Sequence, residues 1–229
     1  MGVPNSVFGA AAAVGGGVLV VGLTGAVLSS HGSNRTTLTA ATTSAAAVTT
    51  GQLPHATLNL SAYPDSMGGE HGSSGGAHPD WVSYGPSTNL HAPAHTLLTV
   101  TIKQYDSGGA ITNPYFAQAR GTIGGTMTVD GKTVKAVDPE AVGHTFTIHS
   151  APTNQDPLFV SVPLPAVADH APNAPGSDYA KPHVVTFSFV TGGPGKYVWN
   201  CEYPCGDGYA SFGGPMATSG YMSGTFTVA

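Results

Sequence analysis

The sequence predicts an all-β protein, and three observations lead to this prediction. Charged residues make up only 8% of the 229 residues, whereas Gly, Pro, Thr and Val are abundant, which is typical of short strands joined by tight turns. Several segments alternate between apolar and polar residues, as a strand with one buried face requires. After residue 30 no segment has the period of an amphipathic helix. Together these features favour packed sheets over a helical or mixed domain.

An apolar run begins the chain. Residues 7–28 contain no charged residue, and about 22 apolar residues are enough for a helix to span a bilayer. Because no Lys or Arg precedes the run and it is long for a signal peptide, we expect an uncleaved anchor within residues 1–30, with a signal peptide as the alternative. Residues 31–54, rich in Ser, Thr and Ala, predict an extended linker. Residues 55–229 then form a membrane-attached domain on the extracytoplasmic side.

Charge and motifs exclude several classes of function. The chain has seven Lys and Arg residues and a net charge of −5, so it cannot form the basic surface that nucleic-acid binding requires. It contains no nucleophile elbow, no phosphate-binding glycine loop and no zinc-hydrolase motif. We therefore assign no catalytic residue and do not expect a catalytic subunit.

Half of the ten histidines lie in a Gly-rich segment at residues 55–96. These histidines are His55, His71, His78, His91 and His95. No two of them have the fixed spacing on a regular element that metal ligands show, so a solvated, partly ordered arm is favoured over a metal-chelating tract. Within this arm, residues 57–61 predict a short edge strand.

Alternation defines the later strands. Their apolar faces are formed by Leu98, Val100 and Ile102, by Leu158, Val160, Val162 and Leu164, and by Val185, Phe187 and Phe189. The dipeptide Asp130-Gly131 predicts a two-residue hairpin between residues 126–129 and 132–137. Residues 191–195, Thr-Gly-Gly-Pro-Gly, predict a second hairpin, which would join the strand of Phe187 to the strand of Trp199.

Two segments carry side chains with metal-binding chemistry. In residues 142–149, His144 has the parity of Phe146 and Ile148 and points into the core, whereas His149 points away. An inward histidine is either a hydrogen-bonded structural residue or a ligand.

The second segment, residues 197–228, gathers sulfur atoms on a loop between two strands. Cys201 and Cys205 follow the first strand, and Met216 and Met222 precede the second. Thiolate and thioether sulfurs suit copper, and two thiols on one loop also suit a disulfide. The residue types alone leave both possibilities open.

These segments resemble the cupredoxins. Tyr197-x-Trp199-x-Cys201, followed by Gly-x-Met222-x-Gly-x-Phe-x-Val, resembles their C-terminal ligand loop, and His144-Thr-Phe-Thr-Ile resembles the context of their N-terminal copper histidine. Residues 201–209 resemble more specifically the dinuclear copper loop of subunit II of haem–copper oxidases. In that loop two cysteines four apart are followed by a histidine and a methionine, whose positions here hold Tyr209 and Phe212.

The resemblance implies a cupredoxin-like Greek-key β-sandwich and a set of candidate copper ligands. This set contains His144, Cys201 and Cys205, with either Met222 or Met216. Because a tyrosine takes the place of the loop histidine, the ligand set is incomplete, and we favour a domain without a cofactor in which Cys201 and Cys205 form a disulfide.

The function implied is that of an accessory subunit of a respiratory electron-transfer complex, with an oxidase or cytochrome subunit as its partner. Two alternatives remain. One is a copper-binding electron-transfer protein with an atypical His/Cys/Met site. The other is a stalked β-sandwich that serves binding or adhesion.

Overall fold

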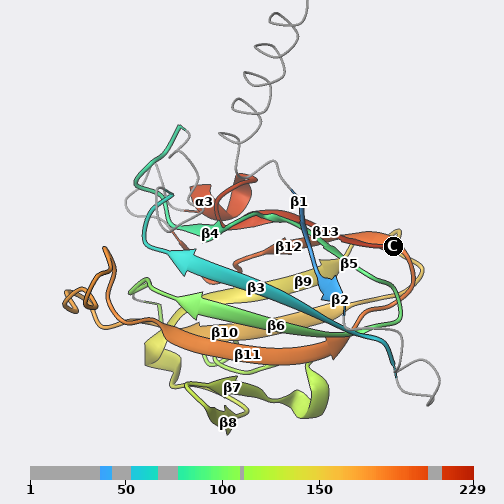
Figure 1. Ribbon diagram of the computed structural model, residues 1–229, viewed down its shortest axis with the longest axis horizontal. Helices are drawn as coiled ribbons and strands as arrows, with labels where there is room; N and C mark the ends of the chain where they lie inside the picture. The colour runs from blue at the N-terminus through green and yellow to red at the C-terminus, as the bar shows by residue number, and fades with distance from the viewer. Residues whose placement is uncertain (1–36, 43–52, 67–76, 109–110, 206–212) are drawn as a thin grey trace, which may run out of the picture.

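The computed structural model describes residues 37–42, 53–66, 77–108, 111–205 and 213–229. These residues form two packed β-sheets (Figure 1). The first sheet contains, in spatial order, β1 (Thr37–Thr39), β5 (Asn89–Ala92), β13 (Ser223–Val228), β12 (Gly195–Asn200), β9 (Val142–Ser150) and β10 (Phe159–Pro165). The second contains β2 (Ala41–Thr42), β3 (His55–Tyr63), β6 (Leu97–Gln104), β11 (His183–Val190), β7 (Met127–Val129) and β8 (Lys132–Val134), and β4 (Ser83–Gly85) pairs with β3. The predicted all-β sandwich is confirmed.

The helical turns of the described residues are short. They are η3 (Ile123–Gly125), η4 (Pro139–Ala141) and α3 (Gly214–Ala217). None of the helices in this part of the chain is long and apolar enough to cross a membrane. The apolar run at residues 7–28 lies outside the described residues, so the anchor stays a prediction.

The core forms where the apolar faces of the two sheets meet. The alternating residues predicted for β6, β10 and β11 are buried as expected; for example, Val100 and Phe187 lie opposite one another across the β6–β11 pair. Trp199 of β12 is fully buried, and its ring lies 5.1 Å from that of Phe146 and 5.0 Å from that of Tyr84 on β4. Since β4 belongs to the other sheet, these rings join the two layers next to the cysteine loop.

The segments before residue 96 are more regular than the sequence predicts. Residues 37–42, inside the expected linker, add β1 to one sheet and β2 to the other. The expected short edge strand is instead the nine-residue β3, which pairs in parallel with β6 over its length. Parallel pairing is missed because it leaves no turn signal in the sequence. Of the arm's histidines that the structure describes, His55 bonds Thr99 and His78 stacks on Trp81, whereas His71 lies outside the described residues.

The two predicted hairpins have different outcomes. Asp130 and Gly131 take φ values of 48° and 82° and connect β7 to β8 as predicted. The hairpin predicted at residues 191–195 is wrong, because β11 pairs with β6 and β7 whereas β12 pairs with β13 and β9 in the opposite sheet. The buried hydroxyl of Thr191 donates to Pro93 O and accepts from Thr96 N. These two bonds anchor the connection by which the chain crosses from the second sheet to the first. Tertiary anchoring of this kind leaves no local turn signature.

We predict that Gly224→Ala strongly destabilises the sandwich. The carbonyl oxygen of Thr88 lies over Gly224, where a β-carbon would be 1.8 Å from it. The same oxygen accepts hydrogen bonds from Trp199 Nε1 and from Thr225 N, so it cannot move without breaking both. Overpacking against fixed backbone lowers the free energy of unfolding by about 1–3 kcal/mol, measurable by guanidinium denaturation. Thr225→Ala, an exposed neighbour on β13, is the control, and equal stability of the two variants would contradict the prediction.

Candidate metal centre

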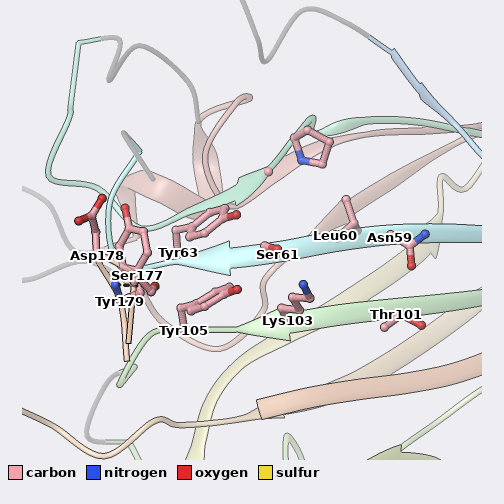
Figure 2. A pocket seen from close by; sticks show the side chains of 13 residues that line it. Asn59, Leu60, Ser61, Tyr63, Thr101, Lys103, Tyr105, Ser177, Asp178 and Tyr179 are labelled. Atoms are coloured by element: carbon pink, nitrogen blue, oxygen red, sulfur yellow. Dashed lines mark hydrogen bonds between the residues drawn. The ribbon is translucent and has the colours of Figure 1, made fainter. Parts of the chain in front are cut away.

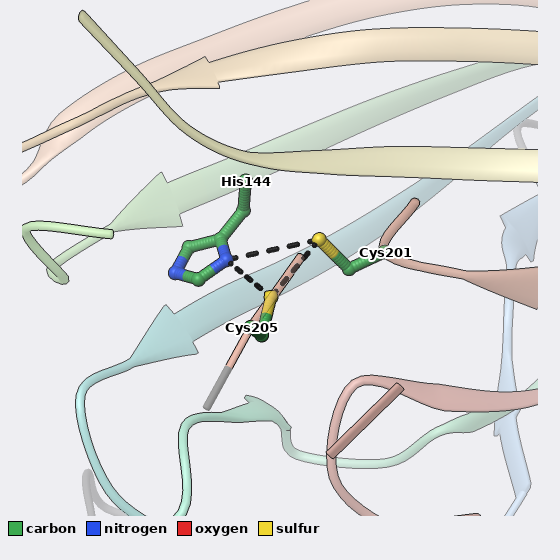
Figure 3. A group of neighbouring side chains, drawn as sticks. All are labelled: His144, Cys201 and Cys205. Atoms are coloured by element: carbon green, nitrogen blue, oxygen red, sulfur yellow. Dashed lines mark hydrogen bonds between the residues drawn. The ribbon is translucent and has the colours of Figure 1, made fainter. Parts of the chain in front are cut away.

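Three buried side chains converge at one end of the sandwich (Figure 3). The Nδ1 atom of His144 lies 3.1 Å from the Sγ atom of Cys205 and 3.7 Å from that of Cys201. The two sulfur atoms are 3.3 Å apart. His144 and Cys201 are 1% and 0% exposed, and Cys205 is 4% exposed. Within the described residues, the potential ligand atoms of these three side chains are close enough together to hold one metal ion.

Strand pairing brings the three residues together. β9 and β12 pair with Thr147 opposite Asn200, so continuing the antiparallel register beyond Asn200 carries Cys201 toward Thr145 and His144. The backbone N–H of Thr145 donates to Cys201 Sγ at 3.3 Å, and the Thr145 hydroxyl accepts from Glu202 N at 2.8 Å. The N–H of Cys201 donates to the Met222 carbonyl at 2.8 Å. These bonds fix the first cysteine between β9 and the start of β13.

The second cysteine belongs to a tight turn after β12. Its Sγ atom lies 3.0 Å from the Tyr203 carbonyl oxygen, and its own carbonyl accepts from Gly213 N at 2.8 Å. The latter bond ties the turn to the segment that enters α3. Cys205 is thereby held on the side of the imidazole where Cys201 already lies.

A carboxylate orients the histidine ring from its other side. Nε2 of His144 lies 2.7 Å from Oδ2 of Asp106, which also accepts from Gly108 N at 3.0 Å. Two glycines permit this approach, because a β-carbon on Gly108 would lie 2.2 Å from the Cα of Gly143. The backbone after β6 thus packs directly on the backbone of β9. With Nε2–H donated to Asp106, the Nδ1 lone pair or proton faces the two sulfurs.

Charge in the group is shared unequally. Burial alone would lower the pKa of His144, but the hydrogen bond to Asp106 and the contact with Cys201 raise it to about 9. Burial alone would raise the pKa of Asp106, yet the hydrogen bond and charge of His144 lower it. For Cys201, hydrogen bonds from Cys205 and His144 outweigh burial and lower the pKa of the thiol. The hydrogen bond to Cys201, together with burial, raises the pKa of Cys205. These directions favour protonation of His144 and Cys205 and ionisation of Asp106 and Cys201 in the metal-free group.

The predicted site residues are only partly tested. His144, Cys201 and Cys205 come together, and His149 points away from the core as expected. Met222 is fully buried, and its backbone bonds Cys201, while Met216 lies on α3. A ligand role for either methionine stays a prediction. Tyr209 and Phe212, which occupy the ligand positions of the oxidase loop, lie outside the described residues.

The expected disulfide is not formed in the structure. Cys201 and Cys205 are free cysteines, and their sulfurs are 3.3 Å apart, whereas a disulfide bond is about 2.05 Å long. The sulfurs are near enough to bond after a small movement, but they are arranged around the Nδ1 atom of His144. This part of the sequence-based prediction is therefore not supported.

Asp106, which follows β6, is a residue of the site that no motif in the sequence indicates. Its role depends on the close packing of Gly108 on Gly143, a contact between segments 35 residues apart in the chain. The one signal in the sequence is that both contact positions, Gly108 and Gly143, are glycines, and a glycine does not show which segment packs against it.

The donor set fits a soft metal ion. Three donors that each lie about 2.0–2.3 Å from one ion are separated from one another by roughly 3–4 Å, and the separations here are 3.1, 3.3 and 3.7 Å. Thiolate and imidazole donors favour copper, above all Cu(I), or zinc over magnesium or calcium. The carboxylate behind the histidine is the outer partner that ligating histidines usually have.

Comparisons with known proteins give low similarities. No protein-family model and no curated protein matches the chain. Among solved structures it is similar to auracyanin B (14% identity, TM-score 0.35, covering 79% of this chain and 92% of that chain) and to the copper protein rusticyanin (13%, TM-score 0.36, 91% and 94%). It is also similar to a multicopper oxidase (11%, TM-score 0.28, 76% and 44%).

His144, Cys201 and Cys205, which form the buried group, are three of the residues on which the sequence's resemblance to the cupredoxins rests. TM-scores and identities this low do not establish a shared function. What the chain binds has to be inferred from its own side chains.

We predict that His144 of the metal-free protein titrates with a pKa of about 9 and that Asp106→Asn lowers this pKa. A neutral amide no longer stabilises the imidazolium. Because the folded pKa lies above the usual value of 6.5, protonated His144 stabilises the metal-free fold fully below about pH 6.5, and this contribution is lost as the pH rises through about 9. The ¹⁵N shifts of the His144 ring, followed against pH in the unaltered chain and in Asp106→Asn, test this. An unchanged pKa of His144 in Asp106→Asn would contradict it.

Proposed function

We propose that this domain binds one copper ion through His144 Nδ1, Cys201 Sγ and Cys205 Sγ and serves in electron transfer. The observation that carries the proposal is the mutual approach of these three donor atoms in a buried site. Copper held by thiolate and imidazole supplies a one-electron redox couple. Burial and the N–H bond from Thr145 to Cys201 hold the sulfurs in place, and a rigid site is what rapid electron transfer requires.

The chain's own groups prepare the site for a cation. Binding requires that both thiols and the Nδ1 position lose their protons. The lowered pKa of Cys201 leaves one thiolate already formed, while Cys205 must still release its proton. Asp106 retains the Nε2 proton and keeps the ring oriented, so its negative charge partly balances the incoming positive charge.

We predict that the full chain binds one equivalent of Cu(I) in competition with bathocuproine disulfonate. Cys201→Ser, Cys205→Ser and His144→Gln should each abolish this binding at the same chelator concentration. Asp106→Asn should weaken it by about 10–100-fold, as for other outer partners of ligating histidines. His149→Gln, on the same strand but pointing away, is the matched control. Unchanged affinity in both cysteine variants would overturn the proposal.

Oxidation of the bound Cu(I) to Cu(II) then distinguishes whether the site serves electron transfer or copper storage. A thiolate-to-copper charge-transfer band, together with reversible reduction, supports electron transfer. Met222→Leu and Met216→Leu, compared by the position of that band, test whether either thioether is a further ligand. A site that binds only Cu(I) and loses the metal on oxidation would contradict the electron-transfer role.

A metal-free role is the second candidate, in which Cys201 and Cys205, which are free cysteines in the structure with sulfurs 3.3 Å apart, act as a pair of redox-active thiols. The thiolate of Cys201 and the thiol of Cys205 can form a disulfide when an oxidant accepts two electrons and the one thiol proton, that of Cys205, leaves. The same two sulfurs cannot then act as thiolate ligands. The two candidates are thus alternative states of one pair of residues.

We predict that bound Cu(I) protects the thiols from oxidation. The metal-free full chain treated with diamide should lose both free sulfhydryls as the Cys201–Cys205 disulfide forms, while diamide is reduced to the hydrazine. The Cu(I)-loaded chain should retain them, because the sulfur lone pairs are engaged. Thiol titration after removal of metal and oxidant measures the difference. Equal oxidation of both forms would show that the sulfurs do not hold the metal.

We further propose that the domain is membrane-anchored on the extracytoplasmic side and exchanges electrons with a respiratory oxidase or cytochrome subunit. The uncharged run at residues 7–28 supports the anchor, and the resemblance to the oxidase copper domain supports the partner. Fractionation of cells that express the full chain tests the first point, with alkaline carbonate extraction to separate embedded from adsorbed protein. Copurification with haem-containing subunits tests the second.

A further inference from the structure

We propose that a tyrosine-lined groove on the outer face of the second sheet binds a neutral oligosaccharide. The groove has a volume of about 540 Å³, and none of its lining residues belongs to the His/Cys/Cys group. Its floor is built by the paired strands β3 and β6, and its rim includes Gly85, Pro86 and residues 176–179 (Figure 2). The proposal does not depend on copper binding.

Three tyrosine rings form one end of the groove. Tyr63 and Tyr105 stack with centroids 5.2 Å apart and planes inclined by 11°. Tyr179 lies 5.3 Å from the first and 5.6 Å from the second. All three are half-buried, whereas clustered aromatic side chains in a β-sandwich usually lie in the core between the sheets. A partly exposed group of rings beside polar side chains is the kind of lining that small-molecule sites have.

The floor of the groove supplies hydrogen-bonding groups in register. Across the parallel pair, Asn59 lies opposite Thr101 and Ser61 opposite Lys103. Because alternate residues of a strand face the same side, these four side chains project from the sheet on the side of the tyrosines. In Figure 2 the hydroxyl groups of Tyr63 and Tyr105 extend along the strands toward Ser61 and Lys103. Donors and acceptors thus follow the groove away from the aromatic end.

The charges around the groove favour a neutral ligand. Its lining carries one cation, Lys103, and one anion, Asp178. The hydroxyl of Tyr179 donates to both carboxylate oxygens of Asp65, at 3.2 Å each. Burial, followed by the charge of Asp65, raises the pKa of Tyr179, so this phenol stays neutral. A polyanion would meet the carboxylate of Asp178 in the lining and that of Asp65 behind Tyr179, against the single ammonium group of Lys103, which disfavours it.

The spacing of the rings also excludes a cation cage. A quaternary ammonium group has to be enclosed between several ring faces, but these rings pack on one another at 5.2–5.6 Å and leave no space between them for a ligand. The cluster instead offers a continuous apolar wall beside a polar floor. A sugar ring matches that surface, since its C–H groups form an apolar face and its hydroxyls form a polar rim.

The test is calorimetric titration of the purified full chain with maltohexaose, cellohexaose and chitohexaose, in a detergent without a sugar headgroup. We expect at least one of the three to bind. Tyr63→Ala and Tyr179→Ala should each weaken that binding by about tenfold or more, because each removes a ring from the apolar wall. Tyr179→Phe keeps the ring and should retain most of the affinity.

Tyr115→Ala is the matched control, since Tyr115 is an exposed tyrosine outside the groove, 46% accessible. It should bind the oligosaccharide like the unaltered chain. Free-thiol content and near-UV circular dichroism report whether each variant is folded. If Tyr63→Ala does not fold, Tyr179→Ala and Lys103→Met decide the question. Absence of binding to all three oligosaccharides, binding only to dextran sulfate, or undiminished binding in the folded groove variants would overturn the proposal.

Discussion

The position of the His144 ring is the constraint on which the rest of the candidate centre depends. One ring nitrogen bonds a carboxylate at 2.7 Å, and the other lies within 3.7 Å of two sulfurs. A ring without Asp106 could rotate about its side-chain bonds and present either nitrogen to the sulfurs. With Asp106 in place, Nδ1 is directed to them in the metal-free state. The site is thus oriented before any ion enters, which lowers the entropic cost of binding.

Backbone packing is what makes this orientation possible. Gly108 approaches Gly143 so closely that a side chain on Gly108 would force the two segments apart, and a β-carbon on Gly143 would lie 2.8 Å from the Gln104 side chain and 3.1 Å from the Cα of Ala166. Thr145, the next residue but one on β9, uses its N–H for the Cys201 sulfur rather than for a neighbouring strand. Adjacent positions of one strand therefore provide a contact surface, a ligand and a hydrogen-bond donor. This explains why β9 is buried over most of its length, including its hydroxyl-bearing residues.

Whether the sequence could predict a feature of this arrangement depends on how far apart along the chain the contacting residues are. Alternation places Val100, Phe187 and His144 on inward faces because strand periodicity is local. The two cysteines are recognisable from four-residue spacing, and their meeting with His144 follows from the family resemblance. Asp106 and the parallel pairing of β3 with β6 depend on contacts between distant segments, which leave no local pattern. The crossing at Thr191 was missed for the same reason, since a short Gly-rich connection fits both a hairpin and a change of sheet.

The end of β6 serves two different surfaces through adjacent residues. Tyr105 lines the outer groove, whereas Asp106 contacts His144. The backbone between them is anchored on both sides, since Tyr105 N donates to Ala62 O, and the Asp106 carbonyl accepts from Val167 N and from the buried side chain of Gln104. Because these bonds resist displacement, a contact made in the groove need not move the carboxylate behind the histidine. Anchoring of this strand end is thus what allows β6 to serve the buried His/Cys/Cys group through Asp106 and the outer aromatic groove through Tyr105.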